Sequence, residues 1–72
     1  LIDAARNNNF ERVKHLIEQG ADVNAKNNDG YTALIWAVEN NNLEMVQYLI
    51  AKGADVNAQN NYGYTALISA VM

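Results

Sequence analysis

The sequence predicts an all-α protein built from stacked helix-turn-helix units, and three observations support this fold class. Residues 1–39 align without a gap with residues 34–72, at an offset of 33 residues and with 26 identities. Each period holds two short segments whose apolar residues recur at helical spacing. The segments between them are rich in glycine, asparagine and aspartate, which favour turns. A fixed period of this length is typical of a repeat array rather than of a self-contained core.

The elements of one period can be followed from Gly20 to Gly53. Residues 20–31 are expected to form loop and turn, because their glycines, asparagines and aspartates accept positive φ or bond to nearby backbone. Thr32 is expected to cap a short helix whose apolar residues are Ala33, Leu34, Ile35, Ala37 and Val38. Residues 39–42 end that helix, since asparagine accepts the left-handed conformation. A second helix follows, with Leu43, Val46, Leu49 and Ile50 on one stripe, and Gly53 ends it.

Two motifs occur twice in register. The hexapeptide GADVNA occupies residues 20–25 and 53–58, and GYTAL occupies residues 30–34 and 63–67. With these motifs the chain resembles the ankyrin repeat family over its whole length. The resemblance implies an ankyrin-repeat solenoid with projecting β-turns. It divides the chain into a partial first unit with its loop (1–29), a complete middle unit (30–62) and the first helix of a truncated unit (63–72).

The chain departs from the family pattern at two places. Where the family has Thr-Pro-Leu-His, this sequence has Ala33 and Ile35, and one period later Ala66 and Ile68. Ile35 and Ile68 are expected to replace the buried histidine by apolar packing, which can be neutral when both polar partners are lost. The family's Gly-His turn is replaced by two asparagines, 41 and 42, and by residues 8 and 9 in the first unit.

Composition excludes several classes of function. The net charge is −3, from eight acids and five scattered bases, which argues against a nucleic-acid partner. The absence of cysteine excludes disulfides and cysteine-based metal sites. No apolar stretch approaches the roughly 18 residues of a membrane span, and no basic signal-peptide region opens the chain. We therefore expect no membrane partner and an intracellular, cytoplasmic location.

No catalytic, cofactor-binding or metal site is predicted. His15 is the only histidine and its counterpart one period later is Tyr48, which favours a half-exposed helix surface over a catalytic base. Ser69 has no histidine near it in the pattern, so no triad is indicated. Asp22 and Asp29 fall in loops where no cavity is implied. The sequence predicts a protein that is not an enzyme and needs no cofactor.

The resemblance implies that turn tips and the exposed side of the first helix bind other proteins. Within two nearly identical units, the positions that differ include Lys26/Gln59, Asp29/Tyr62 and Trp36/Ser69, while the scaffold stays constant. For Trp36, partial burial against the neighbouring helices is the alternative to an exposed interface anchor. The partner-binding residues expected from the family pattern are Lys26, Asn28, Asp29, Tyr31, Trp36, Glu39, Asn40, Gln59, Asn61, Tyr62, Tyr64 and Ser69.

The resemblance also implies a modification site. In ankyrin proteins, the asparagine of the Val-Asn-Ala segment can be hydroxylated by an asparaginyl hydroxylase that favours an upstream Leu, Asp and Val. Asn24 and Asn57 both stand in this pattern. The alternative is that both asparagines simply satisfy loop backbone groups.

Three functions remain open on the sequence. The first is a protein-protein interaction module without chemistry of its own. The second is a structural array that stacks end to end, with self-association through the open repeat ends. The third is an accessory segment that positions the substrate of a larger enzyme or effector.

Overall fold

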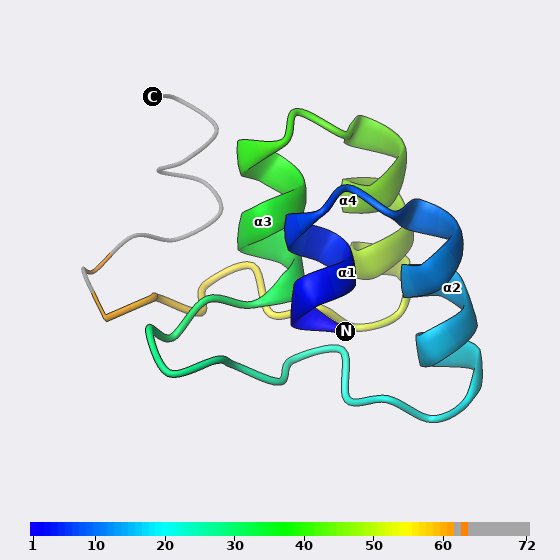
Figure 1. Cartoon of the computed structure of the whole chain (residues 1–72). Coiled ribbons are helices and arrows are strands. Elements are labelled where there is room, and N and C mark those ends of the chain that lie inside the picture. The colour runs from blue at the N-terminus through cyan, green and yellow to red at the C-terminus, as the bar shows by residue number, and fades with distance from the viewer. Residues whose placement is uncertain (62, 64–72) are drawn as a thin grey trace.

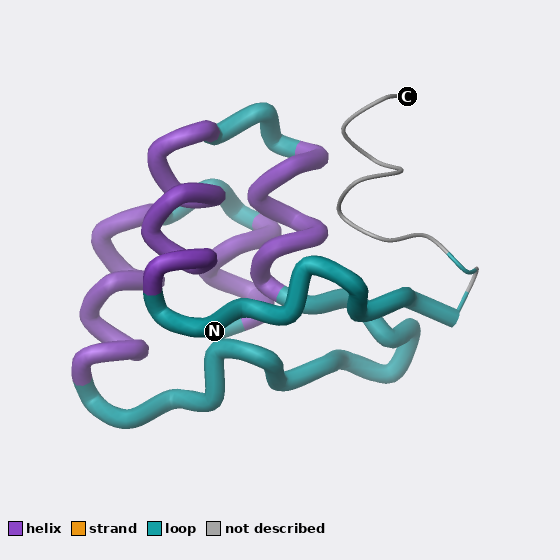
Figure 2. Tube along the Cα trace, turned by 180° about the vertical axis from the view of Figure 1, so that it is seen from behind, coloured by secondary structure: helices purple, strands orange, loops and turns teal. Residues whose placement is uncertain are grey.

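The computed structural model describes residues 1–61 and residue 63, and this part of the chain forms two helix hairpins. The helices are α1 (Ile2–Arg6), α2 (Phe10–Glu18), α3 (Ala33–Glu39) and α4 (Leu43–Ala51). Helices α1 and α3 pack side by side, and each also packs against the second helix of its own hairpin. The long loops that follow α2 and α4 leave the helices on the same side of the molecule (Figures 1 and 2). The predicted all-α repeat architecture is confirmed.

Side-chain caps define where three of the helices begin. Thr32 Oγ1 accepts a hydrogen bond from the Ile35 amide at 3.2 Å, which confirms the cap expected for α3. Asn9 caps α2 in the same way through the Arg12 amide at 3.2 Å. Asn42, one period later, caps α4 at 3.1 Å. The two second helices are thus started by the same residue type at the same repeat position.

Left-handed residues end the helices, as the sequence predicts. Asn8 and Asn41 have φ of 60° and 57° in the tight turns that join the two helices of each hairpin. Gly53 follows the end of α4 with φ of 94°. Asparagine therefore performs at the short turns the conformational task that glycine performs at the longer loops.

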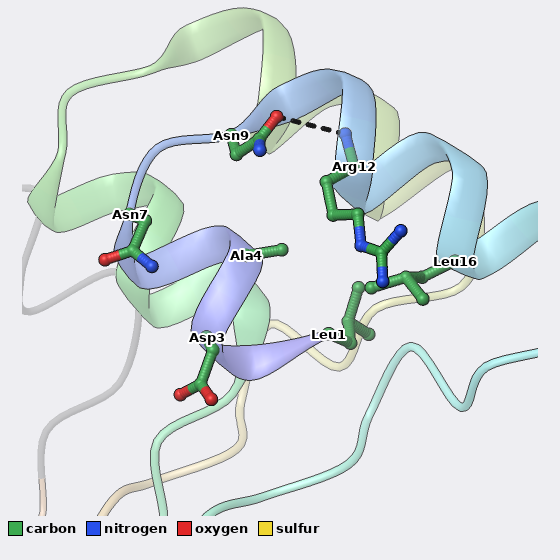
Figure 3. Close-up of a pocket in the computed structure, with 7 residues that line it drawn as sticks. All are labelled: Leu1, Asp3, Ala4, Asn7, Asn9, Arg12 and Leu16. Carbon is green, nitrogen blue, oxygen red and sulfur yellow. Dashed lines mark hydrogen bonds between the residues drawn. The ribbon is translucent and has the colours of Figure 1, made fainter.

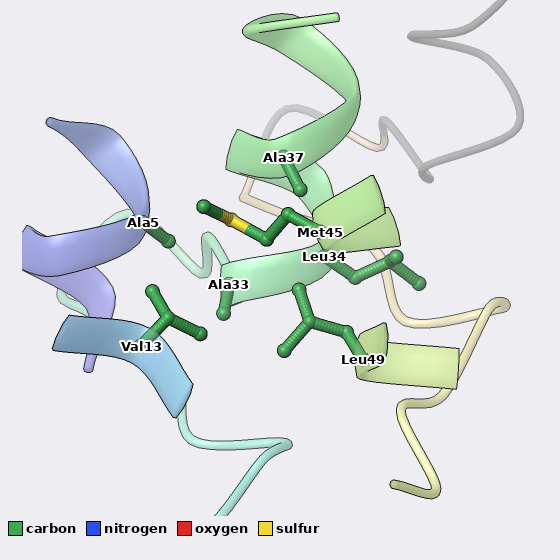
Figure 4. Close-up of a cluster of buried hydrophobic side chains, with 7 residues drawn as sticks. All are labelled: Ala5, Val13, Ala33, Leu34, Ala37, Met45 and Leu49. Carbon is green, nitrogen blue, oxygen red and sulfur yellow. The ribbon is translucent and has the colours of Figure 1, made fainter. Parts of the chain in front are cut away.

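The core lies between the two hairpins and contains residues from all four helices. Small side chains at Ala5, Ala33 and Ala37 allow α1 and α3 to approach closely, and each is fully buried. Ile35, at 1% exposure, is the buried apolar residue expected in place of the family's histidine, whereas Ile68 lies outside the described residues. The core cluster, shown in Figure 4, comprises Ala5, Val13, Ala33, Leu34, Ala37, Met45 and Leu49.

The apolar stripe predicted for α4 is only partly buried. Leu49 is fully buried, together with Met45, which the predicted stripe leaves out. Leu43 and Ile50 are 68% and 47% exposed. Their counterparts in the first unit, Phe10 and Ile17, pack against the core because the second unit covers them. Leu43 and Ile50 lie on the part of the stripe that turns away from the first unit, so their burial depends on a further neighbour.

No helix within the described part of the chain is long and apolar enough to cross a membrane.

Candidate protein-binding surface

Asn27 organises the turn tip that projects between the first two units. Its side-chain oxygen accepts hydrogen bonds from the amides of Asp29 and Tyr31, at 2.9 and 3.0 Å. Its backbone bonds to the Tyr31 carbonyl and the Gly30 amide. The turn is thereby closed from within, and the predicted contact residues Asn28 and Asp29 are exposed at its tip. The sequence pattern alone does not single out Asn27 for this role.

The tips of the two loops form one continuous surface. The Asn61 amide donates to the Asp29 carbonyl at 2.7 Å, and the Asn61 side chain donates to the Asn28 carbonyl at 2.8 Å. Lys26 Nζ reaches the Gln59 carbonyl at 3.4 Å. The structure therefore brings together five of the predicted site residues. Lys26 takes part through its side chain and the other four through backbone groups, and the Lys26 and Gln59 side chains are exposed.

An aromatic pair lies beside these tips. The rings of Tyr31 and Trp36 are stacked, with centroids 4.5 Å apart and planes inclined by 27°. Both residues are half-buried, and Trp36 packs against the core, which is the partial burial expected as one alternative. A role of Trp36 as an interface anchor stays a prediction. Trp36 Nε1 is buried and has no hydrogen-bond partner among the described residues. Stacking favours one relative orientation of the two rings.

The remaining predicted contact residues fall into three groups. Glu39 is exposed at the end of α3. The Asn40 side chain donates to the carbonyls of Ala5 and Arg6, at 2.8 and 3.3 Å, and so joins the two hairpins. Tyr62, Tyr64 and Ser69 lie outside the described residues.

The two candidate hydroxylation sites differ in their surroundings. The Asn24 side chain accepts a hydrogen bond from the Asp55 amide at 2.7 Å and donates to the Gly53 carbonyl at 3.2 Å. Asn57 has the same local turn, with its own amide bonded to Asp55 Oδ1 at 2.9 Å, but its side chain has no partner in the described part of the chain. Hydroxylation at either position stays a prediction, and the structure shows that Asn24 also bridges the two loops.

Sequence reasoning missed this network of cross-unit amide bonds. Its signal is nevertheless visible in the sequence, because all twelve asparagines fall into pairs that are one period apart. These pairs are 7/40, 8/41, 9/42, 24/57, 27/60 and 28/61. Members of five pairs make the cap, turn and cross-unit hydrogen bonds described above, so the asparagine content is largely structural.

Charged side chains in the described residues make surface contacts only. Lys14 Nζ lies 2.9 Å from Glu11 Oε1, and this hydrogen bond raises the pKa of Lys14 above its ordinary value. Arg6 and Asp3 pair at 3.6 Å along α1. No group of three or more His, Cys, Asp or Glu side chains that could hold a metal ion occurs between residues 1 and 61.

Two hairpins related by one period, joined through their loops and helices, define a helical repeat protein. A family model for ankyrin repeats in three copies matches residues 1–72, and the chain belongs to the ankyrin repeat family.

Similar curated proteins cover only part of the chain. It is 54% identical over 37 residues to the mitochondrial disaggregase of Homo sapiens, a match that covers 51% of this chain and 5% of that protein. The mitochondrial disaggregases of Bos taurus and Rattus norvegicus are 51% identical over 37 residues and 52% identical over 33 residues. The matched stretches cover 6% and 5% of those two proteins.

Proposed function

We propose that the chain is a protein-protein interaction module that binds a partner protein through its turn tips and the adjoining side of α3. The observation that carries this proposal is the stacked pair of Tyr31 and Trp36 beside two joined tips. Tyrosine and tryptophan are the residues that most often anchor protein interfaces. Their position beside Lys26 and Asp29, which differ between otherwise similar units, supports the same assignment.

The proposal is tested by replacing Trp36 with serine, the residue that the sequence places at the same position one period later. Affinity capture with the whole chain, followed by mass spectrometry, should identify a partner protein. Trp36→Ser should bind this partner with an affinity lower by about tenfold or more, the loss expected at an interface anchor. Leu43→Ala is the matched control, because Leu43 is apolar and 68% exposed on a different helix. Equal capture by both variants would contradict the assigned surface.

Circular dichroism of both variants must accompany the capture. Trp36 packs partly against the core, so its replacement is expected to lower the thermal midpoint. The assigned role requires that affinity falls at a temperature where helicity is retained.

A second candidate function is an end-to-end array. The exposure of Leu43, Ile50 and Val56 supports it, because the corresponding residues of the first unit are covered by a neighbouring unit. Sedimentation of the whole chain over a concentration series tests this candidate. If the chain is a monomer at every concentration, the end-to-end array is ruled out.

The relatives bear on the third candidate, an accessory segment of a larger protein. In these disaggregases the matched stretch is a small part of a much longer chain, so a unit of this kind occurs beside other regions. Their names place those proteins in mitochondria and lend no support to the cytoplasmic expectation. We keep an intracellular location in the proposal, and fractionation of cells that express the tagged protein tests it.

A further inference from the structure

A pocket between α1 and α2 lies on the side of the first unit that faces away from the second unit. Its apolar residues are Leu1, Ala4 and Leu16, and its polar residues are Asp3, Asn7, Asn9 and Arg12 (Figure 3). We call this set the N-terminal face. It is distinct from the surface around Tyr31 and Trp36, and nothing inferred about it depends on the proposed function.

The N-terminal face repeats the contact by which the second unit packs against the first. One period later, Leu1, Ala4 and Leu16 correspond to Leu34, Ala37 and Leu49, which are all in the buried core.

The polar positions repeat as well. Asn7 corresponds to Asn40, whose side chain donates to the carbonyls at the end of α1. Asn9 corresponds to Asn42, which donates to Asn8 Oδ1 at 3.0 Å. The face thus holds both the apolar and the hydrogen-bonding residues that one unit uses to contact the unit before it.

One substitution changes what this face can accept. Arg12 stands where the second unit has Met45, a fully buried side chain that extends toward Ala5 of the first unit (Figure 4). Arg12 is exposed, and its guanidinium makes no ion pair with another described residue. Figure 3 shows it reaching toward Leu1 and Leu16, across the apolar part of the pocket.

A neighbour stacked on the N-terminal face would cover this guanidinium. Covering a charge without a partner is costly, whereas a carboxylate in contact with it supplies a charge-assisted hydrogen bond. The position that faces residue 12 is the counterpart of Ala5, and in the second unit that counterpart is Val38. Both are apolar, so neither the first nor the second unit of this chain offers a carboxylate to Arg12 at this position.

We propose that the N-terminal face binds a helix-hairpin repeat unit that presents a carboxylate opposite Arg12, and that it discriminates against apolar neighbours such as the units of this chain itself. Arg12 supplies an attractive contact for the first kind of neighbour and a desolvation cost for the second. The remaining residues of the face supply the packing common to both.

A tandem protein tests the proposal, with an extra copy of residues 1–33 placed before the whole chain in repeat register. In the added copy, Ala5 is replaced by Asp or by its isostere Asn, so the two differ in charge and hardly in volume. Each of these two added copies is joined to a whole chain that carries either Arg12 or the substitution Arg12→Met, which gives four tandem proteins. Urea unfolding gives the stability, and its slope reports whether the added unit docks.

The proposal predicts that the order of stability reverses. With Arg12 present, the unfolding equilibrium constant of the Asp tandem is about tenfold or more smaller than that of the Asn tandem, as expected for a charge-assisted contact. This difference in stability shrinks in high salt. With Arg12→Met, the Asn tandem is the more stable. The proposal is overturned if Asp is no better than Asn beside Arg12, or if the added unit docks only in the Arg12→Met chains.

Discussion

The contact between the two units is lined by residues that recur, one period away, on the outer faces of those units. The same residue types nevertheless act differently in the two places. In the contact, Leu49 is fully buried and Asn24 bridges to Gly53 and Asp55. On the outer faces, the counterparts are Leu16, which is half-buried, and Asn57, whose side chain meets no partner among the described residues. The difference shows that a neighbouring unit, rather than the local sequence, decides whether a repeat residue stabilises the fold.

The largest effect is expected for truncation of the apolar residue in the contact. Leu49→Ala should destabilise the protein by about 2–5 kcal/mol, because it removes a fully buried side chain and leaves a cavity. Leu16→Ala, at the equivalent position on the N-terminal face, should cost clearly less. Urea denaturation of the two variants measures the difference, and equal losses would break the comparison.

Glycine substitution at the joined tips should come next. Gly30 has φ of 79°, and a Cβ atom there would lie 2.7 Å from Asn61 Oδ1 and 2.9 Å from the Asn61 nitrogen. Gly20 has φ of 98°, and a Cβ atom there would meet no other described residue within 4 Å. Gly20→Ala should therefore cost only the left-handed strain, about 1–2 kcal/mol, and Gly30→Ala more. Thermal unfolding compares them, and a smaller loss at Gly30 would count against the contact between the tips.

Removal of the bridging side chain of Asn24 should destabilise the protein less than Leu49→Ala or Gly30→Ala. Asn24→Ala leaves the Asp55 amide without its acceptor and should cost about 1–3 kcal/mol, within the range for an unmade hydrogen bond. Asn57→Ala should be close to neutral, although its hexapeptide is the same. The free energies of unfolding of both variants test this expectation. A larger loss for Asn24→Ala than for Asn57→Ala would support the difference between the contact and the outer face.

The smallest effect is expected at the Lys14 and Glu11 pair, which has no charged equivalent in the second unit because Gln47 replaces Lys14. The bond to Glu11 raises the pKa of Lys14, so any linked stability is present below the ordinary lysine pKa and is lost as pH rises through the raised value. Glu11→Gln should lower that pKa in an NMR titration and leave the thermal midpoint at neutral pH unchanged. A large fall in the midpoint would contradict this account.

Sequence reasoning predicted what depends on a single unit. The Thr32 cap, the left-handed Asn41 and the terminal Gly53 follow from local conformational preferences, and all three are confirmed. The burial of Ile35 follows from its place in a nearly apolar helix.

The rest depends on which units are neighbours, and a local pattern does not contain that information. The exposure of Leu43 and Ile50 differs from the predicted stripe for this reason. The stacking of Tyr31 on Trp36 requires the path of the turn, and the Asn24 bridge requires the distance between two loops. The period of the asparagines indicates that such bonds repeat, but it does not say which backbone groups they reach.

Amide hydrogen exchange at two aspartates tests the central claim that the neighbouring unit decides a residue's role. Asp22 and Asp55 occupy the same position of identical hexapeptides, so their intrinsic exchange rates should be nearly equal. The Asp55 amide donates to Asn24 at 2.7 Å, whereas the Asp22 amide has no acceptor among the described residues. We predict that Asp55 is protected, that Asp22 is not, and that Asn24→Ala removes the protection. Equal protection of the two amides would contradict the account.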